Sequence, residues 1–93
     1  MSVLDDLYGL ILSRKHNAPE GSYTASLFAE GEDEMVKKVG EEAIEVIVAA
    51  KGQERQRLIA ECADLVYHVL VLLAAKDVSW VEVEVELERR KNK

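Results

Sequence analysis

The feature that most constrains the fold is a pair of long segments with apolar residues at helical spacing, separated by Gly52. The first segment, residues 32–51, begins with acidic residues and has a stripe formed by Met35, Val39, Ala43, Val46 and Ala50. The second segment runs from Gln53 or Glu54 to Lys76, with a stripe formed by Leu58, Cys62, Leu65, Val69, Leu72 and Leu73. The spacing predicts two long helices that pack as an antiparallel hairpin around Gly52.

Shorter helical signals precede this pair. Ser2 and Asp5 have the S-x-x-D spacing of a helix start, and the apolar residues that follow predict a helix to about Lys15. The stretch from His16 to Gly21 contains proline and glycine and interrupts this helix. A short helix is then expected over Thr24–Glu30, ending at a glycine.

The C-terminal segment carries two conflicting signals. Residues 81–86 alternate valine with glutamate, which is typical of a strand. However, Ser79 and Glu82 have the spacing of a capping box, and the apolar residues Trp80, Val83 and Leu87 share one helical face. Because basic residues at 89–91 also suit a helix C-terminus, we predict a helix here.

These elements indicate an all-α fold, an antiparallel bundle of four to five helices in a single domain over residues 1–93. Between Leu65 and Ala75 only Tyr67 and His68 are polar, so one neighbouring helix cannot cover the apolar surface. A domain of this size buries only about 60–65% of its unfolded surface. We therefore expect oligomerisation to complete the bundle, as a homodimer or homotetramer.

Charge and composition exclude several functional classes. The chain has 18 acidic and 12 basic residues, a net charge of -6, which disfavours nucleic acid and anionic lipid as partners. The longest apolar run, Val69–Ala75, is shorter than the roughly 20 residues that span a bilayer, so no membrane partner is expected. Cys62 has no second cysteine to pair with, and the first residues lack the pattern of a signal peptide, which predicts the cytoplasm.

Acidic side chains lie beside the apolar stripes of both long helices. At about 100° per residue, one flank carries Lys38, Glu41, Glu42 and Glu45, and the other carries Glu61, Asp64 and His68. An antiparallel hairpin lets the two flanks face each other, which predicts a cage of four carboxylates. Clustered carboxylates repel one another unless a proton, a cation or a metal compensates them. Because carboxylate oxygens are hard ligands, the pattern favours magnesium, with manganese as a substitute.

Three segments carry a resemblance to a known family. Glu41, Glu42 and Glu45 followed by Glu61 and Asp64 resemble the EExxE…ExxD signature of the MazG-like all-α nucleotide pyrophosphohydrolases. Together with residues 22–24, 37–43 and 64–68, they resemble the phosphoribosyl-ATP pyrophosphohydrolases of histidine biosynthesis, from about Leu4 to Arg90. The resemblance implies magnesium-dependent hydrolysis of phosphoribosyl-ATP to phosphoribosyl-AMP and pyrophosphate by an oligomeric enzyme.

The resemblance also implies roles for individual residues. The metal ligands would be Glu42, Glu45, Glu61 and Asp64, and Glu41 would orient or deprotonate the attacking water. The substrate phosphates, ribose or adenine would be contacted by Lys37, Lys38, Arg14, Tyr23 and Thr24. Since many relatives carry a fused cyclohydrolase, a separate protein is expected to catalyse the next pathway step.

Other interpretations of the same residues stay open at this point. The acidic cage equally suits a house-cleaning pyrophosphohydrolase of other nucleoside triphosphates. Alternatively, the acids are solvated helix faces of a non-enzymatic dimerisation module. His68 is interpreted as a satisfied core or interface residue in preference to a ligand, and Tyr67 as interface packing in preference to a substrate contact.

Overall fold

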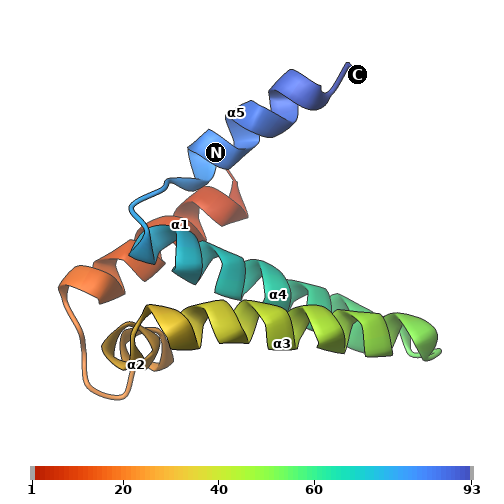
Figure 1. The fold of residues 1–93 in the computed structure, drawn as a ribbon, viewed down its shortest axis with the longest axis horizontal. Coiled ribbons are helices and arrows are strands. Elements are labelled where there is room, and N and C mark those ends of the chain that lie inside the picture. The colour runs from red at the N-terminus through yellow and green to blue at the C-terminus, as the bar shows by residue number, and fades with distance from the viewer. Residues whose placement is uncertain (1, 93) are drawn as a thin grey trace.

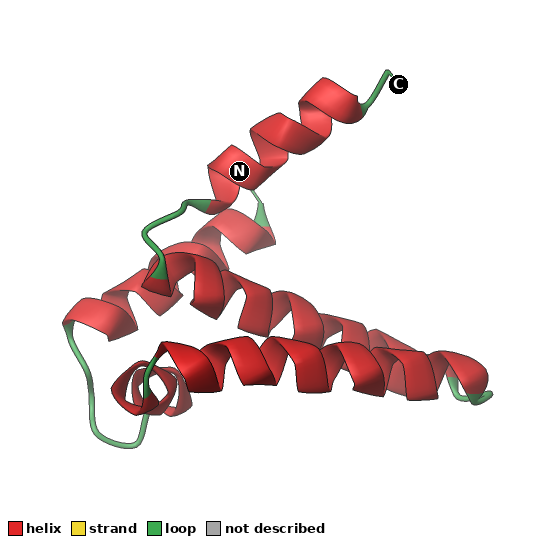
Figure 2. Cartoon of the chain, viewed as in Figure 1, coloured by secondary structure: helices red, strands yellow, loops and turns green. Residues whose placement is uncertain are grey.

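The computed structural model describes residues 2–92 and consists of helices joined by loops, with no strand in this range (Figure 2). The five helices are α1 (Val3–His16), α2 (Tyr23–Glu30), α3 (Glu32–Lys51), α4 (Arg55–Ala75) and α5 (Trp80–Arg90). The predicted all-α fold is confirmed. The predicted bounds of the helix over residues 32–51 are confirmed, and the other predicted helix ends lie within two residues of the observed ones, within the usual uncertainty of helix termini.

Serine caps set the start of three helices. Ser2 Oγ accepts a hydrogen bond from the Asp5 amide, and Ser22 Oγ accepts one from the Ala25 amide. At α5, Ser79 Oγ accepts from the Glu82 amide while the Glu82 carboxylate accepts from the Ser79 amide, so the predicted capping box is present. The valine and glutamate alternation of residues 81–86 is thus overridden by a strong helix start.

The helices are arranged around the α3–α4 hairpin, which turns at residues 52–54 (Figure 1). Helix α1 packs against α4, α2 lies between α1 and the beginning of α3, and α5 packs against α1 and extends away from the hairpin. The core is therefore at one end of the hairpin. It contains Ile11, Leu27, Met35, Leu70, Val71 and Ala74.

Polar contacts fasten the end of α4 to α1. Lys15 Nζ donates to the Ala74 carbonyl oxygen and to Asp77 Oδ1, both at 2.9 Å. The Tyr8 hydroxyl donates to the Val78 carbonyl oxygen at 2.7 Å. The Lys15 bond reaches a carbonyl in the last turn of α4, which has no intrahelical partner, and the Tyr8 bond holds the loop that follows α4.

The end of the hairpin near its turn, away from the core, is less buried than the apolar stripes of its helices predict. Ala49 is buried and Ala50 exposed, although the predicted stripe contained Ala50, and Cys62 of the α4 stripe is also exposed. The reason is that, within residues 2–92, α3 packs along the first half of α4 while α1 packs near the other end of that helix. Large apolar side chains remain exposed on the hairpin, namely Val36, Ile44, Ile47, Val48, Ile59 and Val66.

Helix α4 is long and apolar enough to cross a bilayer by length and composition, with a mean hydropathy of 1.9 in its most apolar window. One such helix is weak evidence for a membrane segment, since the core helices of soluble proteins have the same properties.

Candidate metal centre

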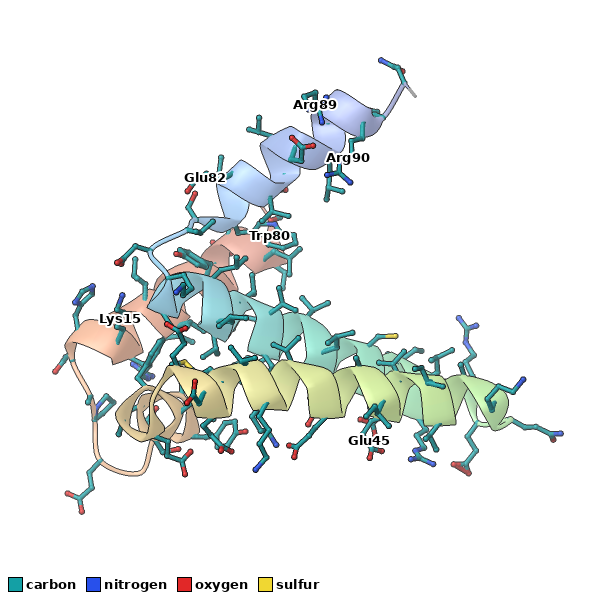
Figure 3. All side chains as sticks on the ribbon, in the orientation of Figure 1. Lys15, Glu45, Trp80, Glu82, Arg89 and Arg90 are labelled. Atoms are coloured by element: carbon teal, nitrogen blue, oxygen red, sulfur yellow. The ribbon has the colours of Figure 1, made fainter. Side chains whose placement is uncertain are left out.

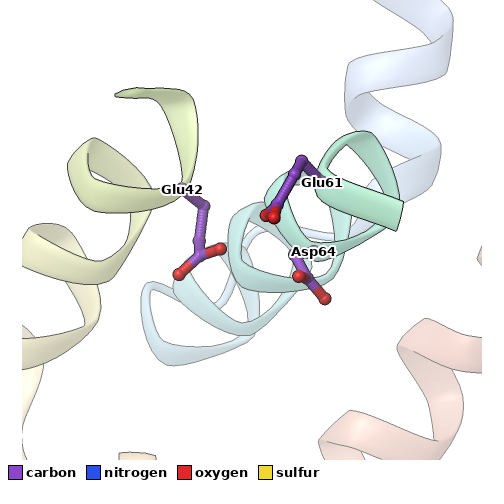
Figure 4. A group of neighbouring side chains, drawn as sticks. All are labelled: Glu42, Glu61 and Asp64. Carbon is purple, nitrogen blue, oxygen red and sulfur yellow. The ribbon is translucent and has the colours of Figure 1, made fainter. Parts of the chain in front are cut away.

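Three carboxylates meet between the two long helices. Glu42 projects from α3, and Glu61 and Asp64 project from α4 one turn apart; Figure 4 shows the three side chains as neighbours between the two helices. One carboxylate oxygen of each lies within 4.8 Å of the corresponding oxygens of the other two. The hairpin therefore brings the two acidic flanks together, as the helical spacing predicts.

Two of the three carboxylates in the cluster are partly withdrawn from solvent. The Glu42 side chain is 14% exposed and the Glu61 side chain 19% exposed, whereas Asp64 is exposed. Lys38 Nζ lies 3.5 Å from a Glu42 oxygen, and Arg57 Nε lies 3.8 Å from a Glu61 oxygen. Three negative charges thus face two positive ones, which leaves the cluster short of positive charge.

This donor set fits a hard divalent cation. Carboxylate oxygens that can approach one point are typical ligands of magnesium and manganese, and an exposed Asp64 leaves that side open to water and substrate oxygens. Among the described residues, the histidines and the cysteine contribute no atom to the group.

Two of the predicted site carboxylates lie outside this group. The Glu45 side chain is 46% exposed and accepts a hydrogen bond from Arg57 Nη2 at 3.4 Å; Figure 3 shows it projecting from α3. Glu41 is 47% exposed and lies 3.6 Å from Lys38 Nζ. The structure therefore brings together three of the four predicted metal ligands.

Lys38 connects the carboxylates to α2. Burial alone would lower the pKa of its ammonium, but the nearby Tyr23 phenol and the Glu42 and Glu41 carboxylates outweigh burial and raise that pKa. Lys38 therefore keeps its positive charge beside the cluster at neutral pH. Lys37 is more exposed and lies 3.7 Å from Glu34.

A group of ring and hydroxyl side chains joins α2 to α4 next to the cluster. Tyr23 Oη lies 3.0 Å from His68 Nε2, and the Thr24 hydroxyl is hydrogen-bonded to the Tyr67 hydroxyl. The Tyr23 and Tyr67 rings are stacked, with His68 edge-on to both. These contacts confirm that His68 is a satisfied buried residue. They were not predicted, because nothing in the sequence pairs residues so far apart.

The remaining predicted substrate residue, Arg14, lies half-buried in the last turn of α1. Within residues 2–92, no hydrogen bond or ion pair joins it to the three carboxylates. Its predicted role as a substrate contact stays a prediction.

Comparison with known proteins identifies similar sequences over nearly the whole chain. The sequence profile of a family described as phosphoribosyl-ATP pyrophosphohydrolase matches residues 4–91. The phosphoribosyl-ATP pyrophosphatase of Trichlorobacter lovleyi is 57% identical over 95% of this chain and 82% of the relative. That of Metallosphaera sedula is 52% identical over 95% of both chains, and that of Listeria welshimeri is 55% identical over 98% and 87%.

Proposed function

Because the chain belongs to the phosphoribosyl-ATP pyrophosphohydrolase family, we propose that it hydrolyses phosphoribosyl-ATP to phosphoribosyl-AMP and pyrophosphate, the second step of histidine biosynthesis, with magnesium. The observation that carries the metal requirement is the convergence of Glu42, Glu61 and Asp64 from two helices. A solvated helix face, as in a dimerisation module, gives no reason for acids of different helices to converge beside a core.

In this proposal the three clustered carboxylates and their neighbours Lys38 and Glu41 have distinct tasks. Glu42, Glu61 and Asp64 hold the cation, and Lys38 contributes positive charge toward the phosphates. When bound, magnesium neutralises charge on the phosphate oxygens and on the leaving pyrophosphate. Water attacks a phosphorus atom of the α–β anhydride, a new P–O bond forms, and the anhydride bond breaks. Glu41 orients this water or accepts its proton.

Glu45 is the fourth ligand in this proposal. It follows Glu42 by three residues and so lies on the same side of α3. Its contact to Arg57 is a solvent-exposed ion pair, which stabilises little and can be exchanged. We propose that Arg57 releases Glu45 when a metal is present.

The chain functions as a homo-oligomer in this proposal, a dimer or a tetramer in the cytoplasm. The supporting observation is the set of exposed apolar side chains on α3 and α4, including Ile44 and Ile47 at 60% and 62% exposure. Exposed apolar residues grouped on one hairpin are typical of a surface that another protein chain covers in the assembly.

The direct test is pyrophosphate release from phosphoribosyl-ATP beside ATP, dATP and dUTP, with magnesium and with excess EDTA. We expect strong preference for phosphoribosyl-ATP and complete loss of turnover in EDTA. The matched pair is Glu42→Gln, which removes a ligand, and Glu84→Gln, which removes an exposed acid of α5. Turnover that survives EDTA contradicts the metal proposal, and turnover of ordinary nucleotides alone contradicts the substrate.

A further inference from the structure

The contacts between α2 and α4 have no task in the proposed chemistry, although they lie next to it. Tyr23 is the first residue of α2, and His68 lies one turn after Asp64 on α4. Their side chains are joined at 3.0 Å. The bond therefore links the beginning of α2 to the same stretch of α4 that supplies a carboxylate.

The hydrogen bonds of His68 fix both its tautomer and its orientation. Its Nδ1 lies 2.7 Å from the Asp64 backbone carbonyl oxygen, which can only accept, so Nδ1 carries the hydrogen. In the neutral ring, Nε2 is then the acceptor for the Tyr23 hydroxyl. Because His68 is only 7% exposed, the surrounding side chains prevent the ring from turning away.

Tyr23 itself is half open to solvent. The residue is 51% exposed although its hydroxyl is bonded to His68, so part of its ring remains accessible. Burial raises the pKa of the Tyr23 phenol, Lys38 opposes this and Glu42 adds to it, which places the phenol within electrostatic reach of both groups. An anchored, accessible aromatic ring beside a cation and a metal-binding cluster suits the planar base of a nucleotide, since bases stack on aromatic faces.

We propose that His68 is a positioning residue that holds the Tyr23 ring as a wall of the nucleotide site, and that it sets nucleotide affinity without setting metal affinity. This inference rests on the proposed function. His68 touches neither substrate nor metal, and it acts through Tyr23. The bond between Thr24 and Tyr67 supports the same placement of α2 from the neighbouring position.

Two substitutions of His68 separate its two hydrogen bonds. An asparagine amide can replace Nδ1 and keep the bond to the Asp64 carbonyl, whereas a glutamine amide reaches further and can replace Nε2 as the acceptor for Tyr23. Tyr23→Phe keeps the ring and removes only the hydroxyl. Because Tyr23 is half exposed, this variant is expected to fold even if a His68 variant does not.

The experiment measures kcat, KM and magnesium affinity for His68→Asn, His68→Gln, Tyr23→Phe and the double variant His68→Asn with Tyr23→Phe. Loss of one neutral hydrogen bond is expected to raise KM about 3- to 10-fold in His68→Asn and Tyr23→Phe, with kcat changed less than about twofold. Magnesium affinity stays unchanged. His68→Gln restores KM to near the wild-type value, and the double variant is no worse than either single variant.

Three results would overturn the inference. In the first, His68→Gln is as impaired as His68→Asn, which indicates a purely structural role. In the second, the effects of His68 and Tyr23 substitutions add, which shows that the two residues act independently. In the third, magnesium affinity falls with KM unchanged, which shows that the substitutions act on the metal through Asp64 and not on the nucleotide through Tyr23.

Failure of the proposed function is distinguished from failure of this inference by the wild-type chain, which would then not turn over phosphoribosyl-ATP. In that case the same four variants are compared by calorimetric binding of ATP with magnesium. Coupled losses of ATP affinity support the positioning role, whereas additive losses or no ATP binding overturn it.

Discussion

The two halves of α4 have opposite environments. In the second half, His68, Leu70, Val71 and Ala74 are buried where α1 packs against α4, and Tyr23 of α2 is hydrogen-bonded to His68. In the first half, Arg55–Asp64, every residue is exposed except Leu58 and Glu61, which are partly covered. The difference follows from the neighbours, because α3 accompanies the whole helix while α1 packs only near its end (Figure 1).

This difference separates the part of the chain that stabilises the fold from the part that is proposed to bind ligands. Burying several carboxylates in a core costs more free energy than their contacts return, so a metal site of this composition belongs at its margin. Glu61 and Asp64 lie where the core of α4 ends, close enough to be positioned by it and open enough to admit a substrate. Stability and chemistry are thus expected to respond to different substitutions.

Asp64→Asn is expected to have the largest effect. Loss of a metal ligand that is proposed to act in catalysis should lower kcat/KM by at least about 10³-fold, measured by pyrophosphate release. The free energy of unfolding should stay equal or rise, because one of three mutually repelling charges is removed. Glu84→Gln is the control. Activity within tenfold of wild type contradicts a ligand role for Asp64.

Leu70→Ala is expected to lower the free energy of unfolding, the quantity that Asp64→Asn should leave equal or raise. Leu70 is fully buried in the second half of α4, so the truncation is expected to cost about 2–5 kcal/mol of unfolding free energy, measured by urea denaturation. Leu10→Ala, the same change at a residue 50% exposed on α1, is the control and should cost less than about 1 kcal/mol. Equal losses would show that stability is spread evenly over the molecule.

Much of the contrast between the core and the site at its margin could be predicted from the sequence, because it depends on local sequence patterns. Capping residues set the starts of α1 and α5, and the Ser79–Glu82 box correctly decided between helix and strand. Periodicity also placed Glu42, Glu61 and Asp64 on facing flanks. The predicted burial of Ala50 was wrong, since a periodic stripe does not specify which of its edges the neighbouring helix covers.

The contacts between distant residues could not be predicted. The ion pair of Glu45 with Arg57 and the hydrogen bond of Tyr23 with His68 depend on how two helices are rotated against each other. A helical wheel gives the face of one helix and carries no information on its partner's rotation. The site was therefore predicted as a set of faces, and its side-chain pairs required the structure.

Ile47→Asp tests the proposed oligomer at the less buried end of the hairpin. Ile47 is 62% exposed on α3, and a charge on a surface that another copy covers should raise the dissociation constant more than about 10-fold. Val85→Asp, at a residue 64% exposed on α5, is the matched control and should leave it unchanged. Sedimentation over a range of concentrations measures both. A wild-type chain that sediments as a monomer throughout contradicts the proposal.

Arg57→Gln should have the smallest effect, with a sign opposite to that of the ligand substitutions. Arg57 contacts both Glu45 and Glu61, so its removal frees two carboxylates for the metal. Because exposed ion pairs are weak, we expect magnesium to bind about 2- to 5-fold more tightly, measured by calorimetry. Arg55→Gln, near the start of α4, is the control. Weaker metal binding by Arg57→Gln contradicts the proposed release of Glu45.

The most direct test of a metal centre at the margin of the core is a manganese titration of the wild-type chain, Glu42→Gln and Asp64→Asn, followed by calorimetry and by thermal unfolding. We expect manganese to bind the wild-type chain and raise its unfolding temperature. Each substitution should weaken binding at least about 10-fold and reduce that rise. Equal manganese affinity in all three proteins would show that the carboxylates between α3 and α4 do not hold the metal.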